Sequence, residues 1–140
     1  MPKTGTIPPE LAAEDWLNVA TAPTLASLRG QVVLLEFWAT WCGPCIQSIP
    51  HLNELQRKYA DQGFKIVSVT DQNRQGIENF TKRTPIVYAI GLEGGATFAH
   101  YGVTKIPQAF LLDKSGKIIW EGNSGDPALD SVLPVAVKSE

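Results

Sequence analysis

The run Val32–Ala39, VVLLEFWA, limits the possible folds of this chain more than any other segment. Branched and aromatic residues fill it, apart from Glu36 and the final alanine, and turn-forming residues bound it at Gly30 and at Gly43-Pro44. Short apolar runs with such borders are typical of strands that are buried on both faces. The run therefore predicts a fully buried strand.

Glu36 places a carboxylate inside this apolar run, six residues before a cysteine. Removing an ionised carboxylate from water costs several kcal/mol even after the protein relaxes. Such a group is paired, kept neutral by a raised pKa, or retained for function. The neighbouring strand expected at 66–70 contains no lysine, so we expect desolvation to raise the pKa of Glu36 above its ordinary value of about 4.3.

Strand and helix patterns alternate along the rest of the chain. The apolar spacing after the cysteines predicts a helix over Gly43–Tyr59, kinked at Pro50. Strands that alternate with helices and end in a hairpin indicate an α/β fold, a three-layer α/β/α sandwich around a mixed central sheet. An opening strand is expected around Trp16–Val19. The further expected strands are 64–70, 86–90, 108–113 and 117–121, and the further expected helices are 77–82, 95–101 and 126–137.

Length and composition are those of one globular domain. The chain has 140 residues, of which 44% are hydrophobic and 19% are charged, and a chain of this size buries roughly 70% of its unfolded surface. We expect a single domain over residues 1–140, in which residues 1–12 form a flexible lead. A formal net charge of -2 without any basic run argues against nucleic acid or an anionic membrane as a partner.

The chain contains no apolar stretch of the roughly 18 to 20 residues that span a bilayer, so we expect no insertion into a membrane. The opening MPKTGTIPPELAAED has neither the apolar core nor the cleavage site of a signal peptide. Met1 is compatible with a natural start and with a start placed after a removed export segment. The expected location is outside the cytoplasm if such a segment was removed, and the cytoplasm otherwise.

Cys42 and Cys45 are the two cysteines of the chain, and they have the C-x-x-C spacing at the start of the predicted helix. Unpaired N–H groups and the helix dipole favour a thiolate there, so the pKa of Cys42 is expected to fall toward about 7. Cys42 is therefore the expected nucleophile. Cys45 lies one turn further in, where shielding suits it to resolve a mixed disulfide. Pro44 in the first turn leaves no hydrogen bond unmade and fixes the loop between the sulfurs.

Two other interpretations of the cysteines are weaker. A structural disulfide that closes only two intervening residues constrains little of the unfolded chain. A zinc site assembled from Cys42, Cys45, His51 and His100 lacks a second paired ligand motif. We therefore expect neither a metal nor another cofactor.

The segments FWATWCGPC and YGVTKIP resemble the thioredoxin superfamily in their order and spacing, and the resemblance extends from about Trp16 to Val137. Three further features are similar to the TlpA and ResA type of thiol-disulfide oxidoreductase: TLASLRGQVVLLEFWATWCGPC, AFLLDKSGKIIWEG, and an extra strand and helix between Phe64 and Tyr101. The resemblance implies a thioredoxin-like sandwich with an inserted strand-helix element. Because this branch is usually exported, it also implies a periplasmic or cell-envelope location.

The resemblance implies a substrate surface beside the sulfurs. Ile106-Pro107 corresponds to the family's cis-proline dipeptide, which packs against both cysteines, although an ordinary turn proline is the alternative. The cis form costs an X-Pro bond about 0.5 to 1 kcal/mol, and it aims the Ile106 backbone at an extended substrate strand. Trp41 is expected on the substrate-facing surface and Trp38 in the core. The expected substrate-binding residues are Trp41, Gly43, Pro44, Ile106 and Pro107.

The resemblance also implies a role for Glu36, because thioredoxins place a buried carboxylate at this position, behind the resolving cysteine. Glu36 then accepts the proton of Cys45, and a raised pKa brings this general base close to working pH. The alternative is a structural carboxylate held by a buried water molecule or a hydrogen bond. Cys42, Cys45 and Glu36 are thus the expected catalytic residues.

Together these features predict a thiol-disulfide oxidoreductase that reduces protein disulfides through a mixed disulfide on Cys42. The Gly43-Pro44 pair is typical of reducing members of the family. The expected partners are protein disulfide substrates and a redox donor protein, and the expected state is a monomer. The alternatives are a thioredoxin-fold binding or chaperone module and a peroxiredoxin-like peroxidase. Ala39 speaks against the peroxidase, because peroxiredoxins carry a threonine three residues before the reactive cysteine.

Overall fold

The buried run of the sequence forms β2 (Val32–Phe37), the strand around which a mixed sheet is built. The other strands are β1 (Asp15–Leu17), β3 (Phe64–Thr70), β4 (Ala89–Leu92), β5 (Gln108–Leu112) and β6 (Ile118–Gly122). This computed structural model describes residues 1–139, and over those residues the sheet has six strands in the order β1-β4-β3-β2-β5-β6. β2 runs parallel to β3 and antiparallel to β5. The predicted mixed sheet is therefore confirmed.

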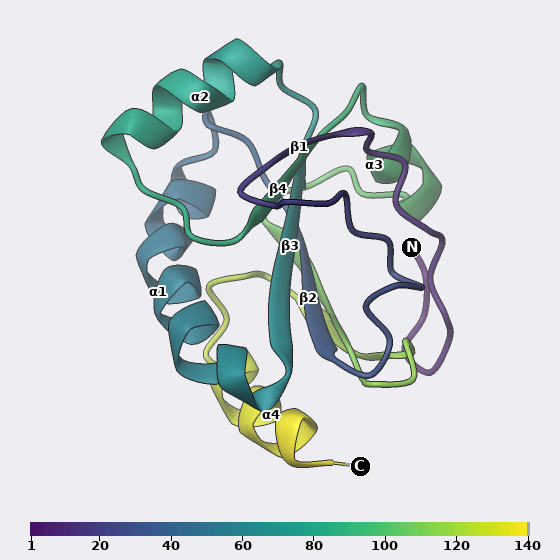
Figure 1. Ribbon diagram of the computed structural model, residues 1–140. Helices are drawn as coiled ribbons and strands as arrows, with labels where there is room; N and C mark the ends of the chain where they lie inside the picture. Colours follow the sequence, from purple (N-terminus) through teal and green to yellow (C-terminus); the bar gives the residue numbers. More distant parts are fainter. Residues whose placement is uncertain (140) are drawn as a thin grey trace.

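Helices cover both faces of this sheet (Figure 1). They are α1 (Gly43–Tyr59), α2 (Arg74–Arg83), α3 (Ala96–Tyr101) and α4 (Ala128–Lys138), with a short 3-10 helix, η1 (Ala60–Gln62), after α1. Helices α1, α2 and α4 pack on one face, whereas α3 packs on the other together with parts of the N-terminal segment. This arrangement confirms the predicted three-layer sandwich. Among residues 1–139, no helix is both long and apolar enough to cross a membrane.

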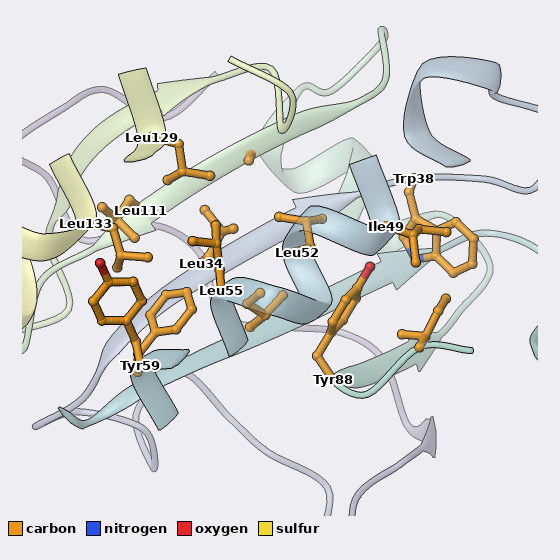
Figure 2. Packing of buried hydrophobic residues seen from close by; sticks show 14 of the residues in the cluster. Leu34, Trp38, Ile49, Leu52, Leu55, Tyr59, Tyr88, Leu111, Leu129 and Leu133 are labelled. Atoms are coloured by element: carbon orange, nitrogen blue, oxygen red, sulfur yellow. The ribbon is translucent and has the colours of Figure 1, made fainter. Parts of the chain in front are cut away.

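Alternating side chains of β2 enter two separate apolar cores. Leu34 belongs to the core under α1 and α4, and Leu35 belongs to the core on the opposite face. Figure 2 shows the first core, where Leu34 lies among leucines of α1 and α4. Because side chains on a strand alternate between faces, Glu36 shares the face of Leu34 and lies under α1. All six residues of β2 are buried, as predicted.

The strand predicted over 86–90 is shifted, because β4 begins three residues later. Polar side chains bind the backbone just before it. Asn53 accepts a hydrogen bond from the Val87 N–H at 3.0 Å, and Asn18 donates one to the Tyr88 carbonyl at 3.0 Å. These backbone groups are satisfied by side chains and do not join the sheet. Apart from α2, every other predicted element begins and ends within two residues of the observed one.

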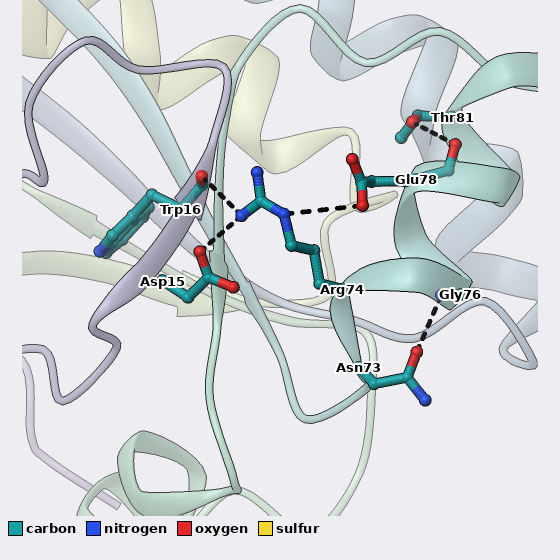
Figure 3. Close-up of polar contacts among 7 residues, drawn as sticks. All are labelled: Asp15, Trp16, Asn73, Arg74, Gly76, Glu78 and Thr81. Atoms are coloured by element: carbon teal, nitrogen blue, oxygen red, sulfur yellow. Dashed lines mark hydrogen bonds and ion pairs between the residues drawn. The ribbon is translucent and has the colours of Figure 1, made fainter.

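Helix α2 begins three residues before its predicted start, because Asn73 caps it there. The Asn73 side chain accepts a hydrogen bond from the Gly76 N–H at 2.8 Å (Figure 3). Arg74, the first helical residue, donates to the carboxylate of Asp15 in β1, and its Nε lies 3.6 Å from Glu78. These half-exposed ion pairs add little stability. Their geometry nevertheless joins α2 to the edge strand β1.

The N-terminal lead makes specific backbone contacts. The Gly5 N–H donates to the Ile118 carbonyl at 2.7 Å, and the Ile118 N–H donates to the Thr6 carbonyl at 3.0 Å. The Glu10 carboxylate accepts hydrogen bonds from two N–H groups of the 24–28 segment, at 2.6 and 3.1 Å. These contacts join the lead to β6 and to the segment before β2. The flexibility of residues 1–12 stays a prediction.

Replacing Leu52 with alanine tests the core under α1. Leu52 is fully buried, so Leu52→Ala is expected to lower the free energy of unfolding by about 2 to 5 kcal/mol through lost contacts and a new cavity. Val135→Ala on the exposed side of α4 is the control, with an expected change within about 0.5 kcal/mol. Urea unfolding followed by circular dichroism measures both variants. Equal losses would contradict the different burial of the two side chains.

Candidate active site

The two cysteines form a disulfide where α1 begins, and their Cα atoms are 5.2 Å apart. Cys42 is the N-cap residue of the helix, and its Sγ accepts a hydrogen bond from the Cys45 N–H at 3.2 Å. Gly43 and Pro44 are exposed at the first two helical positions. Helix N-terminal N–H groups and the helix dipole stabilise negative charge at this point. The site therefore suits a thiolate at Cys42 when the disulfide is reduced.

Both cysteines are buried, and Cys42 keeps the larger exposed fraction. Cys42 is 5% exposed and Cys45 is 0% exposed. Trp41, directly before the first cysteine, is 73% exposed, whereas Trp38 is buried in the core (Figure 2). A partner that approaches this end of α1 meets Trp41 and Cys42 before Cys45.

Gln72 holds the loop that leads to the disulfide, and it is not among the site residues predicted from the sequence. Its Oε1 accepts from the Thr40 N–H at 2.6 Å, and its Nε2 donates to Thr40 Oγ1 at 2.7 Å. Gln72 follows β3, the parallel neighbour of β2, so both residues lie at the same edge of the sheet. The available signal was a polar side chain just after a parallel strand, at the edge where such sheets place their sites.

The Ile106–Pro107 peptide bond is cis, as predicted. Pro107 is buried and directly precedes β5, whose first residue, Gln108, pairs with Phe37 at the end of β2. Ile106 packs against the core that contains both cysteines. The antiparallel pairing of β2 and β5 thus brings this dipeptide close to the carboxyl end of β2, after which α1 begins.

Glu36 is 1% exposed in the middle of the sheet. Burial raises the pKa of its carboxyl group to about 8, and a hydrogen bond from Ser124 opposes part of this rise. Ser124 Oγ donates to Glu36 Oε1 at 3.3 Å, while Oε2 has no hydrogen-bond partner within residues 1–139. The direction of the pKa change agrees with the sequence prediction. Ser124 was missed, because it is 88 residues away in the sequence and nothing near it marks the contact.

Within the part of the chain that the structure describes, residues 1–139, no three His, Cys, Asp or Glu side chains form a group that could hold a metal ion. His51 of α1 has its Nε2 2.6 Å from Asp130 Oδ1 of α4. His100 is exposed in the last turn of α3. The two histidines considered for a zinc site therefore lie on separate helices.

The fold and the site define a class. Proteins with a C-x-x-C disulfide at the start of the helix after a central strand, and a cis-proline at the same sheet edge, are thioredoxin-fold proteins, and this chain has that arrangement. The comparison with known families is more specific, because residues 6–133 match the family Redoxin. The chain belongs to the redoxin family.

Individual relatives agree with the predicted superfamily. The chain is 37% identical over 99 residues to the thiol-disulfide oxidoreductase ResA of Bacillus thuringiensis, which covers 69% of this chain and 57% of that protein. The chain thus spans little more than half the length of this curated relative. Among solved structures, it is similar to a Chlorobium tepidum protein provisionally assigned as the thiol:disulfide interchange protein DsbE, with 31% identity and a TM-score of 0.87 over 96% of this chain and 98% of that one.

A second solved structure is similar over most of its length. It is a Bacteroides thetaiotaomicron protein provisionally assigned as a protein disulfide isomerase, with 28% identity and a TM-score of 0.86. The match covers 98% of this chain and 91% of that chain. The fold therefore extends over nearly the whole of each.

The raised pKa of Glu36 predicts how stability depends on pH. Because the folded pKa of about 8 lies far above the ordinary pKa of a glutamate, the native state binds more protons than the unfolded state between these two values, and stability falls as pH rises through this window. Glu36→Gln should remove this dependence and stabilise the protein more at pH 8 than at pH 5, at about 1.4 kcal/mol for each pKa unit. Melting curves of the oxidised proteins measure it. An unchanged pH slope in Glu36→Gln would contradict the assignment.

The unequal exposure of the two cysteines and the position of Cys42 at the helix N-terminus predict unequal alkylation. In the reduced protein near pH 7, Cys42 should react rapidly with iodoacetamide and Cys45 slowly, because a thiolate at the helix N-terminus is favoured and Cys45 is fully buried. Peptide mass spectrometry after a short pulse identifies the labelled residue, and Cys42→Ser is the matched control. Equal labelling of both cysteines would exclude this division of roles.

Proposed function

We propose that this chain is a thiol-disulfide oxidoreductase that reduces disulfides of protein substrates. The observation that carries this proposal is the Cys42–Cys45 disulfide at the N-terminus of α1. The name of the ResA relative and the C-x-x-C sequence support the same activity. The direction, reduction, rests on Gly43-Pro44, the pair that is typical of reducing members.

The proposed cycle uses both cysteines and Glu36. In the reduced protein, the Cys42 thiolate attacks a substrate disulfide, forms a mixed disulfide and releases one substrate thiolate. Cys45 then gives its proton to the Glu36 carboxylate, and the Cys45 thiolate attacks Cys42 Sγ. The second substrate sulfur leaves as a thiolate and is protonated by water. Two electrons have passed from the protein dithiol to the substrate, and the protein ends with the disulfide observed here.

The proposed substrate surface surrounds Cys42. Trp41 is exposed and supplies apolar contact area beside the sulfur, while Gly43 and Pro44 leave the approach to α1 open. Ile106 is half-buried and directly precedes the buried Pro107, so its backbone is the proposed ledge for an extended substrate segment. Backbone pairing of this kind accepts many sequences, which suits an enzyme that acts on proteins.

Further partners and the location are proposed on the same basis. Because the cycle leaves the protein oxidised, a donor protein has to reduce the Cys42–Cys45 disulfide before the next turnover. The similarity to the TlpA and ResA type supports a location in the periplasm or cell envelope. In this proposal the chain works as a monomer and needs no cofactor, since both electrons come from the two cysteines.

Turbidity of insulin with dithiothreitol as the electron source tests the activity. The wild type should accelerate precipitation of the insulin B chain, and Cys42→Ser should give the uncatalysed rate, because the mixed disulfide cannot form. Cys45→Ser should accumulate substrate proteins linked to Cys42, which identifies the natural partners. Equal rates for wild type and Cys42→Ser would leave a thioredoxin-fold binding or chaperone module as the better interpretation.

A further inference from the structure

A polar cavity adjoins the active site on the side of α1 and α4. Its volume is about 590 Å³, and it lies between α1 and the 123–126 loop that joins β6 to α4. Pro44 and His51 of α1 form part of one wall, and Ser124 and Asp126 form part of the other. The cycle proposed above does not use this cavity.

Ser124 connects the cavity to the buried carboxyl group. It is 1% exposed, it lines the cavity, and its Oγ donates to Glu36 Oε1 at 3.3 Å. Within residues 1–139 this is the one hydrogen bond of the Glu36 carboxylate. Cys45, the proposed source of the proton, is fully buried, and its sulfur is bonded to Cys42, so it carries no thiol proton in this state. Among the described residues, a proton on Glu36 therefore has a hydrogen-bond partner only in Ser124.

The loop holds Ser124 in this position from both sides. The Asn123 side chain accepts from the Gly125 N–H at 2.8 Å, and the Asp126 N–H donates to the Asn123 carbonyl at 2.9 Å. A Cβ atom on Gly125 would lie 3.4 Å from Ser48 Oγ of α1, so the loop backbone packs directly against the helix. The hydroxyl group of Ser124 is thus placed by a tight turn and by contact with α1.

We propose that Ser124 is the positioning residue through which Glu36 exchanges its proton with water in this cavity. The inference rests on the proposed function, in which each turnover transfers the Cys45 proton to Glu36. In the exchange step, the Ser124 hydroxyl first turns from Glu36 toward a water molecule in the cavity. The protonated Glu36 then gives its proton to Ser124 Oγ while the hydroxyl proton of Ser124 passes to that water molecule. A carboxyl group and water thereby become a carboxylate and a hydronium ion, and no bond between heavier atoms changes. The step returns Glu36 to the form that can accept a proton again.

Other titratable groups lie near Glu36 or on the cavity walls, and the experiment has to distinguish them from Glu36. Burial, and to a lesser degree the charge of Glu36, raise the pKa of Tyr88, which lies just before β4. In the neighbouring strands, Ser68 and Ala109 stand opposite Glu36, and neither titrates. The groups to be considered are Cys42 and Cys45 on α1, Tyr88 before β4, and His51 and Asp126 on the cavity walls.

The experiment compares variants that differ in one hydroxyl group. Ser124→Thr and Ser124→Val have the same shape, but only the threonine can donate to Glu36; Ser124→Ala is the smaller deletion. Ser68→Ala is the matched control, because Ser68 is a buried serine beside Glu36 whose hydroxyl donates to the Ala89 carbonyl instead. His51→Gln removes the imidazole group from the cavity wall.

Two measurements are made on each variant. The carboxyl stretch of Glu36, identified in the infrared difference against Glu36→Gln, gives the midpoint of its titration in the oxidised protein. Stopped-flow release of a thiol from a preformed mixed disulfide on Cys42 gives the rate of resolution as a function of pH. Melting temperatures show that each variant is folded.

Ser124→Ala and Ser124→Val are expected to raise the titration midpoint by about one pH unit and to slow resolution near pH 7 by about tenfold, because a hydrogen bond to the charged form is lost. Ser124→Thr, Ser68→Ala and His51→Gln should keep both wild-type values. If Ser124→Val lowers the melting temperature but keeps the wild-type midpoint and pH profile, Ser124 only closes the loop and the proposal is wrong. If the wild type itself does not resolve a mixed disulfide, the proposed function is wrong. The infrared comparison of Ser124→Thr with Ser124→Val does not depend on that activity, and it still decides whether Ser124 binds the Glu36 carboxylate.

Discussion

The burial of β2 in the middle of the sheet is the constraint on which the rest of the structure depends. Parallel β3 and antiparallel β5 satisfy its backbone, and helices must cover both of its faces because all its side chains are buried. The chain leaves β2 at the carboxyl end of the strand and, after a short loop, turns into α1. Packing that fixes β2 therefore also fixes the N-terminus of α1, and with it the sulfur of Cys42.

The same burial creates a conflict at Glu36. An apolar side chain at this point of β2 would pack without any cost of desolvation, whereas a carboxyl group has to stay neutral or lose stability. Its pKa of about 8 lies close to working pH, where a group can both accept and release a proton. The destabilising feature of the core is thus also the feature that would suit the proposed general base.

The site is assembled from segments that are far apart in the sequence. Loops after β2 and β3 meet at one sheet edge, where Gln72 binds Thr40, and the start of β5 brings Pro107 to the same edge. The loop after β6 then closes over the carboxyl group with Ser124. Each contact fixes one part of the fold around the start of α1: the loop that leads to the disulfide, the start of β5, and the surroundings of the buried carboxyl group.

By itself, the sequence determined the features that depend on local pattern. The apolar run with one carboxylate, the helix that begins at the cysteine pair and the alternation of strands and helices were all predicted correctly, because periodicity and turn residues act over a few positions. The cis bond at Pro107 and the role of Glu36 came from a resemblance to a family, and the first of these is present in the structure.

Only the tertiary structure decided which distant side chains meet. The start of β4 was displaced by Asn53 and Asn18, which bind its leading residues across the fold, and Ser124 reaches Glu36 across 88 positions. The small exposed fraction of Cys42, 5% against 0% for Cys45, is likewise a property of the folded chain. Such contacts follow from strand register and loop closure, which are set by the packing of the whole domain and leave no periodic trace in the residues concerned.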